Sequence, residues 1–222
     1  ASLAIALCLL FLTGYLQHLP NVILAAIVLV AILGLFDIKE FVHLFRVSKT
    51  EFTVASIALL GVIFLGILKG VLIAAIASIV LLIKATSNPY VAFLGRIPGT
   101  KRYSDMTRHP DNEAIPGLLI VRVESSILYF NAENIYASIM DKVEKADPPY
   151  QMVLMDLNSS PYVDVAGARF LKKLFHALES KGIRLDVAEA RSEVREILRA
   201  EQLEAMLGPI TRFDSVHHLV RE

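Results

Sequence analysis

The sequence lacks tryptophan and contains a single cysteine, Cys8, within an apolar run. One cysteine cannot build a disulfide framework or a cysteine-based metal cluster, and in such surroundings it usually behaves as a small hydrophobic side chain. The chain also lacks a P-loop and a G-x-G-x-x-G sequence. Without these glycine-rich phosphate-binding loops, a nucleotide is expected to bind only weakly or in an unusual pocket.

Charge is scarce in the first part of the chain. Residues 1–86 contain five basic and three acidic residues, whereas residues 87–222 contain 17 and 19. The first composition is typical of a membrane segment and the second of an ordinary soluble domain. The formal net charge is zero, and neither part is basic enough to predict a nucleic-acid partner.

Residues 1–86 consist mainly of long apolar runs. A helix needs about 20 mostly apolar residues to cross a bilayer, and about 17 can suffice. Residues 52–83 form one apolar block broken only by Lys69. A single helix of that length would measure roughly 48 Å and overshoot a hydrocarbon core of about 30 Å, so we divide the block at Leu68, Lys69 and Gly70. A turn there explains Gly66 and Gly70 better than a helix-dimer motif, and it lets Lys69 reach the headgroups. The sequence thus predicts a polar loop at 37–51 and four spans, at about 1–17, 20–36, 52–68 and 70–86.

Basic residues near the span ends predict the orientation. They lie in the loop 37–51 and after the fourth span, namely Lys39, Arg46, Lys49, Lys84, Arg96, Lys101 and Arg102, and residues 17–20 contain none. Loops rich in Lys and Arg stay in the cytoplasm. We therefore expect an integral multi-pass protein of the plasma or inner membrane with a cytoplasmic C-terminal domain. Because the chain starts at Ala1 inside an apolar run without signal-peptide features, we expect a C-terminal piece of a longer protein.

The second part of the chain alternates predicted strands and helices. Residues 87–117, rich in Pro and Gly, are expected to form a linker and the start of a domain, with a short strand at Tyr90–Leu94. Strands alternating with helices over residues 118–222 predict an α/β domain with a mixed sheet and helices packed on it. The expected strands lie at 118–125, 127–130, 152–157, 183–187 and near Thr211. One expected helix follows Asn131, whose side chain is expected to cap it, and the others run from Val165 to Gly182 and cover 194–207 and 214–221.

A polar loop joins the apolar strand MVLMDL to an amphipathic helix. It contains Asn158, Ser159 and Ser160 and ends in an Asp-x-x-Gly turn from Asp164 to Gly167. Asp164 is expected to cap the helix, a role worth about 1 kcal/mol, and the alternative is a site for an anionic ligand or a partner at the helix N-terminus. Gly167 is expected to allow close packing rather than to contact a phosphate. These five residues are the candidate regulatory or ligand-binding loop.

The same loop does not predict an enzyme. His176 lies three helical turns beyond Asp164, roughly 18 Å by helical rise, which is too far for a hydrogen-bonded Ser-His-Asp triad. The other histidines are scattered, and the neighbours His217 and His218 would face different ways on a helix. We therefore assign no catalytic residue and no metal ligand.

The order of these motifs resembles a known family. A central strand, a loop and an Asp-x-x-Gly turn that opens an amphipathic helix resemble the STAS domain, the fold of anti-sigma factor antagonists. Apolar spans joined to such a domain by AFLGRIPGTKRYSDM resemble the SulP family of anion transporters, called SLC26 in animals. The stretches LPNVILAAIVLVAILGLFD and YFNAENI are also similar to sequences of that family.

The resemblance implies a secondary active transporter of about fourteen spans in two inverted repeats, of which this chain would hold the last four. Its anion site would lie in earlier spans, so no substrate-binding residue is assigned here. The substrate would be a small inorganic or carboxylate anion such as sulfate, bicarbonate or a dicarboxylate, moved by exchange or by symport with Na⁺ or H⁺. The cytoplasmic domain would support a homodimer, or would bind a protein partner or, weakly, a nucleotide.

One departure from the anti-sigma antagonists limits what the resemblance implies. Their turn is usually Asp-Ser-Ser-Gly with a phosphorylated first serine, whereas this chain has Val165 at that position. Valine has no hydroxyl group, which excludes a phosphoserine switch there and leaves Ser159 and Ser160 as the serines of the loop. The alternative function is a membrane-anchored STAS module that binds a partner or senses a ligand without transport. Further spans encoded upstream would favour the transporter.

Overall fold

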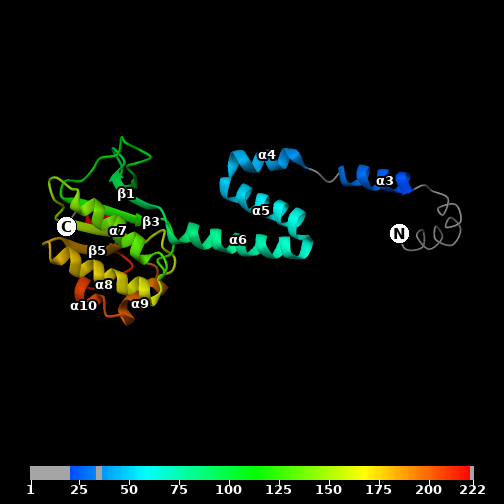
Figure 1. Ribbon diagram of the computed structural model, residues 1–222. Coiled ribbons are helices and arrows are strands. Elements are labelled where there is room, and N and C mark those ends of the chain that lie inside the picture. The colour runs from blue at the N-terminus through cyan, green and yellow to red at the C-terminus, as the bar shows by residue number, and fades with distance from the viewer. Residues whose placement is uncertain (1–20, 34–36, 221–222) are drawn as a thin grey trace. The chain divides into compact units, whose positions relative to one another are not determined.

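The computed structural model describes residues 21–33 and 37–220, which fall into two compact units that meet between Ile79 and Val80 (Figure 1). The first unit is helical, and its last helix continues into the second unit, which holds the sheet. Among the described residues, four helices precede the sheet: α3 (Asn21–Leu33), α4 (Ile38–Val47), α5 (Lys49–Leu65) and α6 (Ile67–Ser87). The span predicted at 1–17 lies outside the described residues.

Within the described part of the chain, α6 is the one helix long and apolar enough to cross a membrane. The helices α3 and α5 occupy the predicted spans 20–36 and 52–68, but with 13 and 17 residues they are shorter. The structure therefore supports one membrane-crossing helix by length and composition, and the number of four spans stays a prediction.

The predicted polar loop at 37–51 is wrong, because most of it forms the helix α4. Asp37 caps this helix by accepting from the Glu40 N–H at 3.0 Å. The apolar side of α4 packs on α5, with the rings of Phe41 and Phe45 edge-on to Phe52 at 4.9 and 5.0 Å between centroids. Charged residues on the other face of an amphipathic helix produced the loop-like composition.

The turn between the last two predicted spans is confirmed as a break, but it lies at Gly66 and not at Lys69. Gly66 adopts φ +83°, a conformation that favours glycine, and Lys69 lies in the first turn of α6. Gly70 instead serves the contact between the helices: a Cβ atom there would lie 2.4 Å from the Val62 nitrogen. Glycine at this position lets the two backbones approach closely.

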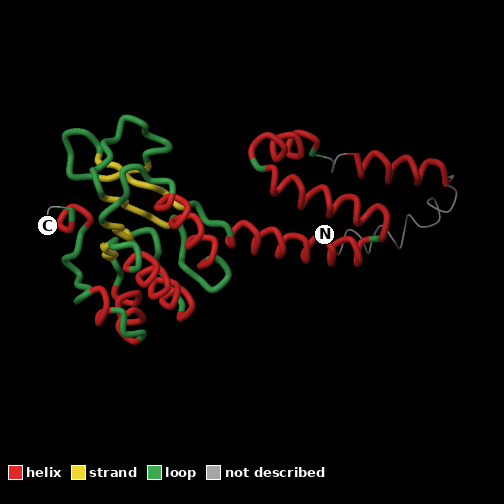
Figure 2. Tube along the Cα trace, turned by 60° about the vertical axis from the view of Figure 1, so that its left-hand side comes forward, coloured by secondary structure: helices red, strands yellow, loops and turns green. Residues whose placement is uncertain are grey.

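The second unit contains a five-stranded mixed sheet, which confirms the predicted α/β class (Figure 2). Its strand order is β2-β1-β3-β4-β5, with β1 antiparallel to β2 and β3, and with β3, β4 and β5 parallel. Residues 87–117 contribute two of its strands. The strands are β1 (Val91–Arg96), β2 (Tyr103–Asp105), β3 (Leu118–Val123), β4 (Met152–Asp156) and β5 (Arg184–Ala188).

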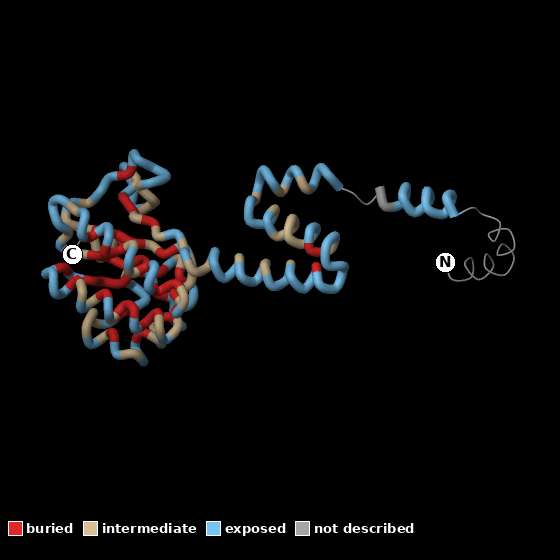
Figure 3. The backbone as a smooth tube through the Cα atoms, viewed as in Figure 1, coloured by how far each residue is buried: buried red, intermediate tan, exposed pale blue. Residues whose placement is uncertain are grey.

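The buried residues of the second unit gather in the sheet and in the helices packed on it (Figure 3), and they form one larger and one smaller apolar cluster. The larger apolar cluster joins one face of the sheet to α7 (Ala132–Glu144), α8 (Val165–Glu179) and α9 (Ser192–Ala200). The smaller cluster on the opposite face includes Ile120, Leu154 and Val216, the first residue of α11 (Val216–Leu219). The short helix α10 (Glu204–Leu207) lies between α9 and α11 in the chain. Because β4 contributes to both clusters, its sequence reads as a continuous apolar run.

Two predicted strands are wrong. Residues 127–130 form only an isolated bridge between Ile127 and Val163, followed by a turn. No strand forms around Thr211 within the described residues, because Asp214 accepts hydrogen bonds from both the backbone and the hydroxyl of Thr211 and closes a turn there. A short apolar run cannot by itself show whether it finds a partner strand.

Candidate functional site

Asp164 occupies the start of α8 and uses both carboxylate oxygens. Its Oδ1 accepts from the Gly167 N–H at 2.7 Å, which is the predicted N-cap, and its Oδ2 accepts from the Tyr129 N–H at 2.9 Å. The side chain thus satisfies one free N–H group of the helix and fixes the turn before α7. This geometry gives Asp164 a structural role that joins two segments 35 residues apart.

Gly167 has a packing role, as the sequence predicts. A Cβ atom at this position would lie 2.5 Å from the Ile127 carbonyl oxygen and 3.0 Å from the Val163 side chain. The backbone of α8 therefore passes directly over the 127–163 bridge. Only glycine allows this approach without displacement of the neighbouring chain.

The two loop serines differ in their access to solvent. Ser160 is fully buried, and its hydroxyl donates to the Val123 carbonyl oxygen at 3.3 Å. Ser159 is partly exposed, and Asn158 is exposed with its N–H donating to Asp156 Oδ1 at 2.9 Å. A modifying enzyme could reach Ser159 but not Ser160 in the folded domain. The five predicted loop residues are therefore close in the chain but face different surroundings.

The YFNAENI stretch holds a junction that sequence reasoning missed. Asn131 is fully buried; its Oδ1 accepts from the Leu128 N–H at 2.8 Å, and its Nδ2 donates to the Ser126 carbonyl oxygen at 3.0 Å. The same Nδ2 reaches the carbonyl oxygen of Thr86, the residue before the end of α6, at 3.4 Å. This side chain was predicted only as a cap of α7, but the structure shows no capping bond from it to that helix.

A second asparagine strengthens the junction. Asn134 Nδ2 donates to the Ser87 carbonyl oxygen at 2.8 Å and to the Asn88 Oδ1 at 3.0 Å. The last carbonyl groups of a helix lack partners within the helix. The asparagines on and before α7 supply such partners to the end of α6. The signal in the sequence was the spacing of two asparagines by three residues, which places both on one side of a helix start.

The outer antiparallel strands carry a polar cluster around Asp105. Burial raises the pKa of this carboxyl group, but hydrogen bonds from the Tyr90 hydroxyl and from Thr107 together outweigh burial and lower the pKa below its usual value. The bond from Tyr90 joins the residue just before β1 to the end of β2. The cluster ties the start of the domain to its edge strand.

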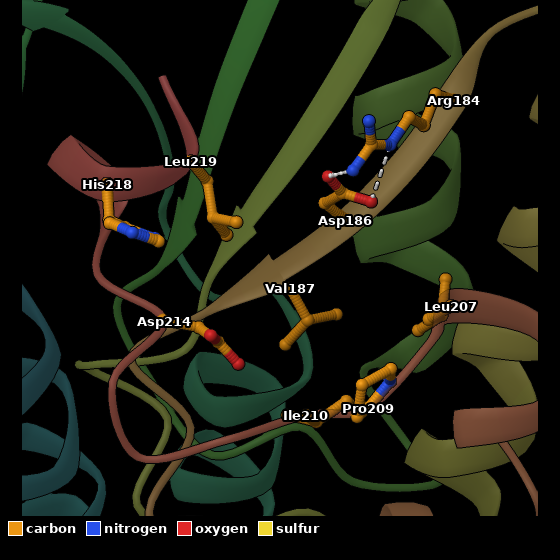
Figure 4. Close-up of a pocket in the computed structure, with 9 residues that line it drawn as sticks. All are labelled: Arg184, Asp186, Val187, Leu207, Pro209, Ile210, Asp214, His218 and Leu219. Atoms are coloured by element: carbon orange, nitrogen blue, oxygen red, sulfur yellow. Dashed lines mark hydrogen bonds and ion pairs between the residues drawn. The ribbon is translucent and has the colours of Figure 1, made fainter. Parts of the chain in front are cut away.

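One small cavity lies beside the edge strand β5 (Figure 4). Its volume is about 240 Å³, and the ion pair between Arg184 and Asp186 lies in its wall. Arg184 Nε donates to the Asp186 Oδ1 at 3.0 Å, so this buried carboxylate is neutralised by its neighbour on the same strand. The pair offers no free nucleophile or base. No group of three or more metal-ligating side chains occurs among the described residues.

Two known protein families match separate parts of the chain, one in the helical part and one in the part that holds the sheet. The STAS domain family matches residues 109–219, which is half of the chain, and the sulfate permease family matches residues 1–58. The chain is 32% identical to a probable sulfate transporter 4.2 of Arabidopsis thaliana over 99% of its own length. It is 30% identical to the high affinity sulfate transporter 1 of Stylosanthes hamata over 93% of its length. It spans 34% and 32% of these relatives, about a third of each.

Solved structures show the same fold. The murine Slc26a9 anion transporter in the inward-facing state aligns with 99% of this chain at a TM-score of 0.76 and 22% identity, and the chain covers 36% of it. Another SLC26A9 structure aligns with 83% of the chain at a TM-score of 0.71 and 17% identity, and the chain covers 32% of that protein. The order of helices followed by a mixed-sheet domain is therefore shared with these structures.

Proposed function

The chain belongs to the SulP/SLC26 family and carries a STAS domain, and from this premise we propose that it forms part of a secondary active transporter of small anions. The observation that carries the proposal is the continuity of the apolar helix α6 with the STAS sheet. Val91, the first residue of β1, follows the end of α6 by four residues. An anchor that served only to tether a soluble module would not require the family's membrane sequence at residues 1–58.

The proposed substrate is a small inorganic or carboxylate anion. Sulfate is the first candidate because the curated relatives are named as sulfate transporters, and bicarbonate and dicarboxylates are the others. Transport would be exchange or symport with Na⁺ or H⁺. We assign no substrate-binding residue to this chain, and the lipid bilayer is the expected environment of α6.

Uptake by proteoliposomes that contain the product of the complete gene tests this proposal. Labelled sulfate, bicarbonate and succinate are offered with and without Na⁺ and pH gradients. We expect at least one anion to accumulate, to be displaced by its unlabelled form, and to respond to one gradient or to an exchangeable anion inside. Absence of uptake for all three anions would contradict the substrate class and favour the anchored module.

We further propose that the STAS domain lies in the cytoplasm, where it supports a homodimer or binds a protein partner or a ligand. Asp164 provides the test because it combines a cap with a negative charge. Asp164→Ser keeps a capping oxygen and removes the charge, whereas Asp164→Ala removes both. If a partner or a ligand binds the Asp164 carboxylate, we expect transport or dimerisation to change in both variants. Asp164→Ser loses the acceptor for the Tyr129 N–H, so a purely structural role predicts a loss of stability in both variants that is smaller for serine. Such a loss with unchanged transport and dimerisation would leave only the structural role.

A further inference from the structure

A second and larger cavity lies at the carboxyl ends of the parallel strands, on the face of the sheet away from α7 and α8. Its volume is about 650 Å³, within the range of about 300 to 1,000 Å³ that is usual for small-molecule sites. Its walls come from β3, from the residues after β4 and β5, from the loop between β1 and β2, and from the start of α11. In open α/β sheets, ligands bind outside the carboxyl ends of the strands.

Arg122 provides a fixed group of hydrogen-bond donors in this cavity. Its Nε and Nη2 both donate to the Asp156 Oδ2, at 2.8 and 2.6 Å, and Asp156 is fully buried. A guanidinium group has five N–H donors, and the other three contact no acceptor among the described residues. The Arg122 side chain stays 21% exposed, so these donors are accessible to a ligand. Asp156 thus orients a planar donor group that suits an oxyanion.

Two further cations face the same cavity. Lys101 and Arg102, on the loop between β1 and β2, line it and form no ion pair with any described residue. Because Asp156 neutralises Arg122, these two cations exceed the one remaining carboxylate in the lining, that of Glu189. The cavity therefore carries a net positive charge when it is empty of ligand.

The backbone conformation of Glu189 independently indicates that this cavity is a binding site. Glu189 directly follows β5 and adopts φ +57°, although it is not a glycine. Its N–H donates to the Asp214 carbonyl oxygen at 2.8 Å, which holds the strained conformation in place. Such strain in non-glycine residues concentrates at binding and active sites. The conformation leaves the exposed Glu189 carboxylate among the lining residues, where it can accept from a hydroxyl group of a ligand.

We propose that this cavity binds the phosphate monoester of a small polar molecule, with the phosphate held by Arg122, Lys101 and Arg102. The volume exceeds that of a single oxyanion, so the remainder of the ligand occupies the space toward Glu189 and Ser215. Asn158 of the candidate loop lines this cavity, whereas Asp164 caps α8, which packs against the opposite face of the sheet. The inference does not depend on transport, since the binding residues all belong to the STAS domain.

Calorimetric titration of the detergent-solubilised chain with glycerol 3-phosphate, inorganic phosphate and glycerol tests the proposal. We expect glycerol 3-phosphate to bind more tightly than inorganic phosphate, and glycerol not to bind. The double variant Lys101→Glu, Arg102→Glu should weaken binding at least about tenfold, since it places two negative charges beside the anion. The variant Arg122→Lys keeps the charge and should also weaken binding, because lysine cannot reproduce the planar donor group.

The matched control reverses two exposed lysines at the opposite end of the strands, Lys145 and Lys181, to glutamate and leaves the cavity intact. We expect its affinity for glycerol 3-phosphate to stay within about twofold of the original chain, because exposed charges more than a Debye length of about 10 Å away are screened. Thermal unfolding in the absence of ligand checks that all variants fold. Equal weakening in the control, unchanged binding in the Lys101 and Arg102 variant, or no preference for the ester over phosphate would overturn the proposal.

Discussion

The side-chain amide nitrogen of Asn131 lies 3.4 Å from the carbonyl oxygen of Thr86 and joins the start of α7 to the end of α6. The two residues are 45 positions apart in the chain. Asn131 also bonds both sides of the turn before α7, so one buried side chain holds this turn and contacts the end of α6. A change in the tilt of α6 would therefore act on the start of α7 through these bonds.

Replacement of Asn131 by alanine should lower the free energy of unfolding of the STAS domain by about 1 to 3 kcal/mol, because it leaves several part-buried backbone groups without partners. The exposed Asn134 should matter less, with a loss below about 1 kcal/mol in Asn134→Ala. Urea unfolding followed by circular dichroism measures both values. Hydrogen exchange should show faster opening at the end of α6 in Asn131→Ala, and equal effects of the two changes would contradict the assigned junction.

The sign of the stability change in Gly167→Ala tests how closely α8 packs on Ile127. In an ordinary helix this change stabilises by about 0.5 to 1 kcal/mol. Here the new Cβ would lie 2.5 Å from the Ile127 carbonyl oxygen, so we expect a loss of about 1 to 3 kcal/mol instead. The neighbouring change Ala166→Gly reports the helix propensity alone. A more stable Gly167→Ala variant would show that α8 does not pack on Ile127 as described.

Gly70 should be equally intolerant of a side chain in the membrane unit. A methyl group there would meet the backbone of Val62 at 2.4 Å and push α5 away from α6. We expect Gly70→Ala to lower the yield of monodisperse protein in mild detergent. The exposed neighbour Ala75 provides the control, since Ala75→Gly removes a methyl group from the same helix without affecting the contact. Normal yield and stability of Gly70→Ala would argue against the close helix crossing.

The hydrogen bond from Tyr90 to Asp105 predicts a change in acid stability. A carboxyl group whose pKa is lowered on folding contributes stability above its unfolded pKa, and this contribution is lost as the pH falls through the folded pKa. Tyr90→Phe removes one of the bonds that lower this pKa, so acid unfolding should begin at a higher pH. Tyr129→Phe is the control, because the exposed hydroxyl of Tyr129 forms no hydrogen bond with the described residues. Acid titration followed by circular dichroism compares the two, and identical midpoints would contradict the assignment.

Much of the fold could be predicted from the sequence because its signals are local. The apolar run of β4, the amphipathic pattern of α8 and the cap at Asp164 each depend on residues within one element and its ends. The position of the α5–α6 turn could not be predicted, because the sequence alone does not show which of Gly66 and Gly70 forms the turn. The structure shows that a positive φ requires the first and a helix contact requires the second.

The junction and the larger cavity could not be predicted because both depend on contacts between distant segments. Asn131 looks like a helix cap until its amide is seen to reach Thr86. Arg122 and Asp156 lie 34 residues apart, and only the pairing of β3 with β4 places them opposite each other. The candidate loop stays a prediction. The burial of Ser160 could not be read from the loop itself, because its hydroxyl bonds to the Val123 carbonyl group on another strand.

Labelling of an engineered cysteine tests most directly whether the STAS domain lies in the cytoplasm at the end of a membrane-crossing helix. Lys101→Cys and, separately, Lys69→Cys are placed in a full-length protein in which every native cysteine, Cys8 included, has been replaced by alanine, and the cells are exposed intact to a membrane-impermeant maleimide. The predicted turn between the last two spans lies on the side opposite to the basic segments that flank them, so we expect the reagent to label position 69 from outside. We expect it to reach position 101 only after the membrane is permeabilised. Labelling of position 101 in intact cells would contradict the account.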